Sequence, residues 1–270
     1  MFFWIYDYPD WLMALAFMAA FTAFGVGGLF VFRGTALEWL HRDSRANDMV
    51  GFAMSSFAML YGILLGLMAV DASQNLTDMV NTVDREAASL GALYRDAGGY
   101  PAPLGGELQG VLRGYTRDLI DNAWPAQREG ITQERTTTEL NSFFKRVQAF
   151  KPGDAGETVI HQEALRQANN LMELRRLRLA SVNTGIHGLL WAVVLFGAAI
   201  NIGLVWMLRM SRHVHIVLTG LLAAFIGVVI FLIAAMDYPF RGDISVSADS
   251  FEEVYQSMMA ADAKAAGTQF

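Results

Sequence analysis

Residues 50–95 read VGFAMSSFAMLYGILLGLMAVDASQNLTDMVNTVDREAASLGALYR, and this stretch decides the fold. Its first part, Val50–Val70, has no charged residue and is long enough to cross a bilayer core, which takes about 20 helical residues. Its second part, Asp71–Arg95, is charged, lacks proline and keeps apolar residues at helical spacing. The pattern predicts one helix that leaves a membrane and becomes the first helix of a water-soluble domain.

Three other segments are as apolar as Val50–Val70, and none contains Asp, Glu, Lys or Arg: Trp11–Phe32, Gly188–Leu208 and Val214–Met236. The whole chain is 54% hydrophobic and 17% charged, whereas a soluble domain is nearer a quarter charged. The leader before Trp11 has no Lys or Arg, so we expect a membrane anchor there and no cleaved signal peptide. Four transmembrane helices are therefore predicted.

The polar residues between the second and third spans are numerous enough for a domain of their own. Clusters of Gly and Pro divide these residues into four expected helices. The first continues from the second span and ends near Ala97, the second covers 104–123 and stops at Trp124-Pro125, and the third covers 132–150. The fourth covers 157–181 and is expected to continue directly into the third span. The expected organisation is a membrane hairpin over 1–70, a helical extramembrane domain over 71–183, a second membrane hairpin over 184–236, and a tail over 237–270.

The tail is expected to contain a short helix. Ser250 followed three residues later by Glu253 matches a capping box, and Phe251, Val254 and Met258 follow at helical spacing. The fold class is therefore an all-α membrane protein with four spans and a helical domain inserted between spans two and three.

Composition and motifs exclude several classes of function. The chain has no Cys, so thiol catalysis and thiolate metal sites are absent. It contains no H-E-x-x-H, G-x-S-x-G or P-loop motif, which argues against an enzyme. The net charge of −6 gives no indication of nucleic-acid binding.

The first part of the tail is acidic and carries Asp237, Asp243, Asp249, Glu252 and Glu253. Calcium takes six to eight oxygen ligands, so a clustered acidic turn could contribute to a calcium site. The spacing does not match an EF-hand loop, and a solvated acidic tail with a capped helix is the alternative.

The polar residues in the inner part of the spans, away from their ends, are all neutral: Thr22, Ser55, Ser56, Tyr61, Asn201 and Thr219. Ion-coupled transporters usually keep an ionisable residue within the membrane, so this pattern argues against a proton-coupled carrier. A passive pore lined by apolar and hydroxyl groups remains open as a function, because such a pore can gate by dewetting.

The second span is the candidate for lining a pore. Its residues Phe57, Tyr61, Leu64 and Met68 are spaced by four, three and four, so they share one face of the helix. On a neighbouring face, Gly62 and Gly66 form a small-xxx-small motif that permits close helix packing. The alternative interpretation of the stripe is a packing or lipid-facing surface.

Several short motifs follow one another along the chain in the order and spacing found in one protein family. They are Asn47-Asp48 and Gly51, Arg85-Glu86-Ala87, Leu93-Tyr94-Arg95, Arg175-Arg176-Leu177-Arg178, Leu190-Trp191-Ala192, and Asp237-Tyr238-Pro239-Phe240-Arg241-Gly242-Asp243. On these residues the chain resembles the bestrophin-like family of bacterial membrane proteins, and more distantly the bestrophins.

The resemblance implies a pentameric anion channel of the bacterial inner membrane, with chloride among its ions and the second span lining an apolar neck. It also implies that Pro239, Phe240 and Gly242 form a turn ahead of acids that clasp calcium. Two departures stand against a full match. Asp71-Ala72-Ser73-Gln74 replaces an aromatic pair of bestrophins, and the acidic run is sparser.

The two indications of membrane orientation disagree. The short hairpins carry Arg33, Arg42, Arg45, Arg209 and Arg212, so the positive-inside rule puts them in the cytoplasm, with both termini and the domain in the periplasm. The resemblance implies a cytosolic domain. Two functions fit the sequence: a homo-oligomeric ion channel, and a non-conducting scaffold or sensor whose domain binds a protein partner.

Overall fold

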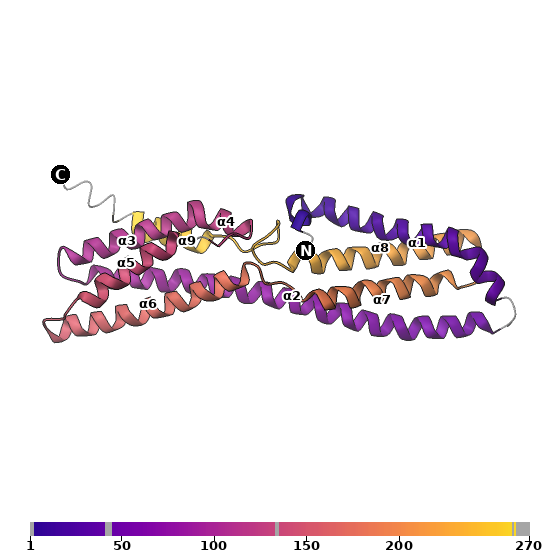
Figure 1. Cartoon of the computed structure of the whole chain (residues 1–270), viewed down its shortest axis with the longest axis horizontal. Helices are drawn as coiled ribbons and strands as arrows, with labels where there is room; N and C mark the ends of the chain where they lie inside the picture. Colours follow the sequence, from indigo (N-terminus) through magenta and orange to yellow (C-terminus); the bar gives the residue numbers. More distant parts are fainter. Residues whose placement is uncertain (1–2, 41–44, 133–134, 261, 263–270) are drawn as a thin grey trace. The chain divides into compact units, whose positions relative to one another are not determined.

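The structure, a computed structural model, describes residues 3–40, 45–132, 135–260 and 262, without the side chains of 33–40 and 135–137. Within these ranges every regular element is a helix (Figure 1). Arg42, counted above for membrane orientation, lies outside the described residues, as does the side chain of Arg33. The chain divides into two compact units, which we describe separately.

The membrane unit comprises residues 1–75, 185–237 and 242–244. It holds four helices that are long and apolar enough to cross a membrane: α1 (Asp10–Leu40), the first part of α2 (Ala46–Gly98), α7 (Gly188–Trp206) and α8 (Arg212–Met236). A short 3₁₀ turn, Phe3–Asp7, precedes α1. The four-span topology is confirmed, and the chain is a multi-pass membrane protein.

Small residues let α1 approach α8 closely. A Cβ added at Gly25 would stand 2.9 Å from the Cβ of Ala223, and one at Gly227 would stand 2.8 Å from the carbonyl oxygen of Phe17. The indole of Trp206 on α7 donates a hydrogen bond of 2.7 Å to the carbonyl oxygen of Gly25. Such contacts bring the helices together in the manner expected inside a bilayer, where small residues dominate helix interfaces.

The helical unit comprises residues 76–184, 238–241 and 245–270. After the second part of α2 it contains α3 (Leu104–Asp118), a π-helical turn (Leu119–Ala123), α4 (Trp124–Arg128), α5 (Arg135–Ala149), α6 (Ala155–Ser181), α9 (Asp249–Val254) and a second π-helical turn (Tyr255–Met259). Its core combines apolar residues of all the longer helices, among them Leu90, Leu93, Leu112, Phe143 and Leu171.

The prediction that the second domain helix stops at Trp124-Pro125 is wrong. The chain passes from α3 through the π-helical turn into α4, which ends at Arg128. Pro125 lies in the first turn of α4, where its missing N–H is tolerated. The π-helical turn Leu119–Ala123 directly precedes α4, so the chain stays helical from α3 through Pro125.

The predicted continuity of the last domain helix with the third span is also wrong. Helix α6 ends at Ser181 and α7 begins at Gly188. In between, Asn183 donates a hydrogen bond of 3.0 Å to the carbonyl oxygen of Gly130. The hydroxyl of Thr184 donates to the carbonyl oxygen of Ala180, at 2.7 Å. Two helices were predicted to run without a break between a span and the domain. Helix α2 does so, whereas α6 and α7 are separate helices.

The short helix of the tail is present, but the predicted capping box is wrong. Helix α9 begins at Asp249, and no side chain caps its first turn. The hydroxyl of Ser250 instead donates a 2.5 Å hydrogen bond to the carboxylate of Asp84. The tail thus belongs to the helical unit, where Phe251 is completely buried.

Candidate pore helix and buried ion pair

One face of α2 is packed inside the membrane unit. Tyr61, Leu65 and Met68 are 5–7% exposed and belong to an apolar cluster with residues of α7 and α8. The ring of Tyr61 lies against the backbone of Gly197, where an added Cβ would stand 2.7 Å from the ring. The absence of a side chain at Gly197 therefore allows this close α2–α7 contact.

The predicted pore stripe is split by this packing. Phe57 is 46% exposed, whereas Tyr61 and Met68 are buried against the chain's own helices and Leu64 is half-buried. The prediction that all four side chains face a pore therefore needs correction: Tyr61 and Met68 serve as packing residues in this structure. Periodicity showed that the four share a face, but it did not show which way that face turns.

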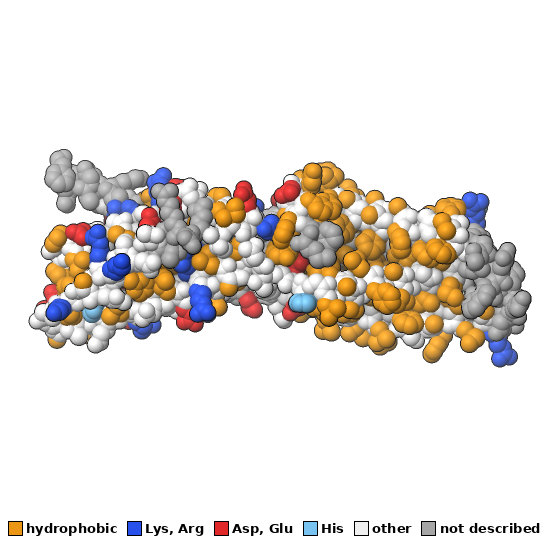
Figure 2. Space-filling model, in the orientation of Figure 1, with side chains coloured by type: hydrophobic (Ala, Val, Ile, Leu, Met, Phe, Trp, Pro, Cys, Tyr) orange, Lys and Arg blue, Asp and Glu red, His pale blue; other side chains and the backbone are white. Residues whose placement is uncertain are grey.

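The opposite face of α2 is open. Phe52, Met59, Ile63 and Val70 are 78%, 69%, 51% and 53% exposed, and their spacings of seven, four and seven place them along one line. Ile63 is two residues from both Tyr61 and Leu65, hence about 200° round the helix from each. Figure 2 shows such hydrophobic side chains across the visible surface of the spans.

Gly62 and Gly66 are open as well. A Cβ added at either position would meet no atom of the chain within 4 Å. The small-xxx-small motif therefore does not pack against another described helix of the same molecule. Its predicted role in helix packing remains a prediction.

A groove runs between α2 and α7, with a volume of about 170 Å³. Its lining residues are Phe57, Leu60, Tyr61, Leu64, Val193, Phe196, Gly197, Ile200 and Asn201. The amide of Asn201 donates a 2.9 Å hydrogen bond to the carbonyl oxygen of Gly197. The buried hydroxyl of Tyr61 has no hydrogen-bond partner among the residues that the structure describes. A second groove, of about 250 Å³ between α1 and α7, is lined by apolar side chains only.

The helical unit holds a buried ion pair between Arg178 of α6 and Glu86 of α2, which are 1% and 0% exposed. Nε of Arg178 lies 2.7 Å from one carboxylate oxygen, and Nη2 lies 3.0 Å from the other. The third nitrogen, Nη1, donates to the side-chain oxygen of Gln127 at 2.5 Å. Each of the three guanidinium nitrogens thus donates a hydrogen bond to a side-chain oxygen.

Aromatic rings cover the guanidinium of Arg178. Its central carbon lies 5.4 Å from the centroid of the Trp124 ring and 5.9 Å from that of Phe251. Burial alone would lower the pKa of Arg178, but the charge and hydrogen bonds of Glu86 raise it above the usual value. Burial also raises the pKa of Tyr115 to about 12, so its phenol stays neutral beside the pair.

The motif Arg175-Arg176-Leu177-Arg178 marks three arginines alike, and its sequence did not predict that Arg178 forms the buried pair. Arg176 is exposed and Arg175 is 6% exposed. Arg178 follows Leu171 by seven residues and so lies on the apolar face of α6, a signal that could have found it. Gln127 carried no such signal, because its contact depends on how the helices pack.

Sequence comparison agrees with the fold. The sequence model of a family described as "Bestrophin-like domain" matches residues 19–251, which is most of the chain. The chain belongs to the bestrophin-like family. No curated protein sequence matches this bestrophin-like protein.

Two crystal structures share its fold. One is a bacterial bestrophin homolog from Klebsiella pneumoniae with a leucine-to-threonine mutation, at 10% identity and a TM-score of 0.58; the match covers 89% of this chain and 98% of that one. The other is described as a membrane protein with a proline-to-alanine change, at 12% identity and a TM-score of 0.56, covering 88% and 97%. These likenesses confirm the bestrophin-like fold.

The other motif residues of this bestrophin-like protein have varied surroundings. Arg85 and Arg95 are exposed on α2. Tyr94 is buried, and its hydroxyl accepts a hydrogen bond of 2.8 Å from Arg113. The motif thus mixes surface and core positions of the helical unit.

The motif after α8 turns the chain sharply. In the helical unit Phe240 is fully buried with its ring 5.6 Å from that of Trp124, and the carbonyl oxygen of Pro239 accepts from the Val246 N–H at 2.8 Å. In the membrane unit Gly242 has φ +80°, a left-handed conformation that favours glycine. The resemblance predicted a turn at these residues, and the backbone makes one.

Asp237, the first of the acids predicted to bind calcium, is held by hydrogen bonds within the membrane unit. Asp237 accepts hydrogen bonds from the Ile186 N–H and, at 3.2 Å, from the indole of Trp191. Burial raises the pKa of Asp237 above its usual value, although these two hydrogen bonds act in the opposite direction. A carboxylate occupied by N–H donors is poorly suited to a cation, because the donors would have to be displaced.

The remaining acids belong to two different units. Asp243 accepts a 3.2 Å hydrogen bond from the Asp10 N–H in the membrane unit. Asp249, Glu252 and Glu253 belong to α9 in the helical unit, and all three are exposed. Among the described residues no group of three His, Asp or Glu could hold a metal ion, so the residues do not fit a calcium clasp.

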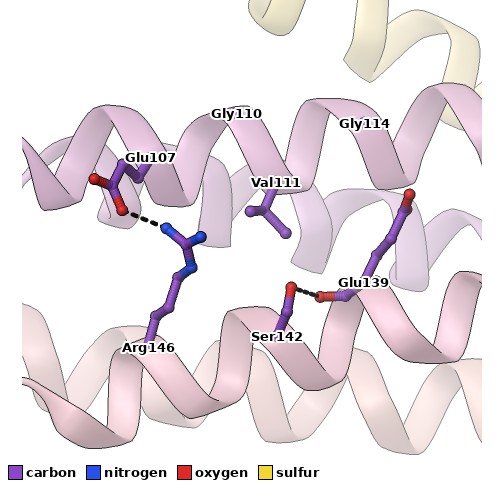
Figure 3. A pocket seen from close by; sticks show the side chains of 7 residues that line it. All are labelled: Glu107, Gly110, Val111, Gly114, Glu139, Ser142 and Arg146. Atoms are coloured by element: carbon purple, nitrogen blue, oxygen red, sulfur yellow. Dashed lines mark hydrogen bonds and ion pairs between the residues drawn. The ribbon is translucent and has the colours of Figure 1, made fainter.

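A shallow groove of about 490 Å³ lies between α3 and α5 in the helical unit (Figure 3). Gly110 and Gly114 form one wall, and Ser142 on the other donates 2.7 Å to the carbonyl oxygen of Glu139. Glu107 and Arg146 form an ion pair across its end. The pairing neutralises the two charges, and the groove brings no catalytic combination together.

Proposed function

We propose that this bestrophin-like protein is the subunit of a homo-oligomeric ion channel in a bacterial inner membrane, with α2 of each copy lining the pore. The observation that carries the proposal is the open apolar face of α2. Phe52, Met59, Ile63 and Val70 are uncovered, while the opposite face packs on α7. The resemblance to bestrophins adds the expectation of five copies and of an anion such as chloride.

The chemistry of this face suits a passive, gated pore. Between Val50 and Val70 the helix carries no charge, so an ion passing it meets no fixed partner that would hold it. A narrow ring of Met59 and Ile63 side chains would shed water when the helices stand close together, and would admit hydrated ions when they move apart. Permeation is then controlled by the width of the ring.

Anion flux through liposomes containing the purified protein tests the proposal. Met59→Ala and Ile63→Ala should raise the flux several-fold, because each removes bulk and apolar surface from the ring. Phe225→Ala is the matched control: Phe225 is 67% exposed on α8, outside the proposed pore, and its loss should leave the flux unchanged.

Met68→Ala separates the new interpretation from the sequence-based one. Met68 is buried in this structure, so its truncation should affect stability more than conduction. A larger change of flux in Met68→Ala than in Ile63→Ala would show that the other face lines the pore. Wild-type liposomes that pass neither anions nor cations would overturn the channel proposal.

A further inference from the structure

The α2 helix carries two different surfaces on opposite flanks. Gly62 and Gly66 lie on one flank, where an added Cβ would meet none of the described atoms within 4 Å. Leu60 and Leu64 lie on the other flank, where they border the α2–α7 groove. Each leucine is two residues from Gly62, which places it about 200° round the helix.

We infer that the Gly62–Gly66 flank of one copy packs into the α2–α7 groove of the next copy. This inference rests on the proposed homo-oligomer and names its subunit contact. The occupant of the groove is a second copy of this chain, because copies that stand parallel around one axis hold equal residue numbers at equal depth. Gly62 and Gly66 of one copy therefore stand level with Leu60 and Leu64 of its neighbour.

The chemistry of the groove matches this occupant. Its walls are apolar, and its polar groups are the Tyr61 hydroxyl and the Asn201 amide. Tyr61 is 7% exposed and its hydroxyl has no partner, which is costly in a membrane where water does not compensate. Small residues let helix backbones approach closely, so a neighbouring helix seated at Gly62 and Gly66 brings backbone carbonyl oxygens, which are hydrogen-bond acceptors, to this groove.

A contact between two different surfaces is heterologous, and it closes into a ring only if each copy is rotated from the last by an equal fraction of a turn. The proposed homo-oligomer requires that closure, and the cross-linking test below distinguishes a contact that repeats from copy to copy from one that joins two copies only. The open line of Met59, Ile63 and Val70 lies between these flanks and would face the axis.

Disulfide cross-linking in membranes tests the contact directly, and the chain has no native Cys to interfere. The double variant Gly62→Cys/Leu60→Cys should give, on oxidation, a ladder of covalent oligomers that extends beyond the dimer. Either single variant should give none. A double variant that yields only monomer, or only dimer, overturns the heterologous contact.

Gly62→Cys/Phe225→Cys is the control pair, since Phe225 lies on α8 away from the groove and is as exposed as Leu60, at 67% against 65%. It should give no ladder. A ladder as strong as that of the first pair would show that cross-links form by random collision, and would also overturn the contact.

Oligomer mass in nanodiscs or detergent gives an independent readout. Gly62→Ile/Gly66→Ile should reduce the particle to a single chain, because two branched side chains fill the space a neighbour needs. Gly27→Ile is the matched control, since Gly27 is also an exposed span glycine with no atom within 4 Å. Variants that keep the wild-type mass and flux would overturn this contact while the channel proposal stands; a wild-type protein that is monomeric and passes no ion would end both.

Discussion

Replacing Arg178 by Met leaves Glu86 as an uncompensated charge in the core of the helical unit. Both residues are at most 1% exposed, and the pair is held by two hydrogen bonds of 2.7 and 3.0 Å. Removal of one partner from such a pair typically costs about 3–5 kcal/mol. Because 1.4 kcal/mol is a factor of ten, the most protected amides of α2 and α6 should exchange roughly 100- to 4,000-fold faster.

Hydrogen exchange measured by mass spectrometry on the intact protein in nanodiscs reports this change. The double variant Glu86→Met/Arg178→Met should exchange more slowly than either single variant, because two apolar side chains of similar volume leave no buried charge. It should stay somewhat faster than wild type, since Gln127 loses its donor.

The exposed pair of Glu163 and Arg166 supplies the control. Arg166→Met removes an ion pair whose side chains are 39% and 66% exposed, and solvent screening makes its loss almost neutral. The reasoning is refuted if Arg178→Met changes exchange no more than Arg166→Met, or if the double variant shows the summed effect of its two single changes.

Other perturbations act on single features. Burial, and then the charge of Glu163, raise the pKa of Asp96 above 3.8. The free energy of unfolding of the wild type should therefore fall as the pH rises through that raised pKa. Asp96→Asn should have a higher melting temperature than the wild type at about pH 7 but not at about pH 3. Gly242→Ala places a Cβ at φ +80° and should cost about 1–2 kcal/mol, seen as a lower melting temperature in detergent. Gly197→Ala pushes the Tyr61 ring off α7 and should lower the melting temperature, whereas Gly203→Ala, with open space around it, should not. An alkaline phosphatase fusion at the C-terminus should be active if the positive-inside count sets the orientation, and inactive if the domain is cytosolic.

The spans and the unbroken α2 could be predicted because each depends on local composition. An apolar, uncharged segment of this length has few structures available other than a membrane helix. The sequence after Val70 has no proline to stop the helix that began at Ala46. The break after Ser181 was missed because it depends on long-range hydrogen bonds, such as that from Asn183 to Gly130.

The candidate pore face shows a different limit of sequence periodicity. Spacing predicts that Tyr61, Leu64 and Met68 share a face, but two apolar faces of one span look alike when both are hydrophobic. The deciding residue is Gly197 on another helix, because it makes room for the Tyr61 ring. Packing partners of this kind follow from the assembled bundle and not from one helix.

The central claim is that the open face of α2 borders an ion pathway on a symmetry axis. A cryo-EM map of the protein in lipid nanodiscs tests it most directly. We expect a ring of parallel copies, five by resemblance, with Met59, Ile63 and Val70 of every copy facing an axial passage and Gly62 against the next copy. A map in which these side chains face lipid at the periphery, or in which no passage lies on the axis, would contradict it.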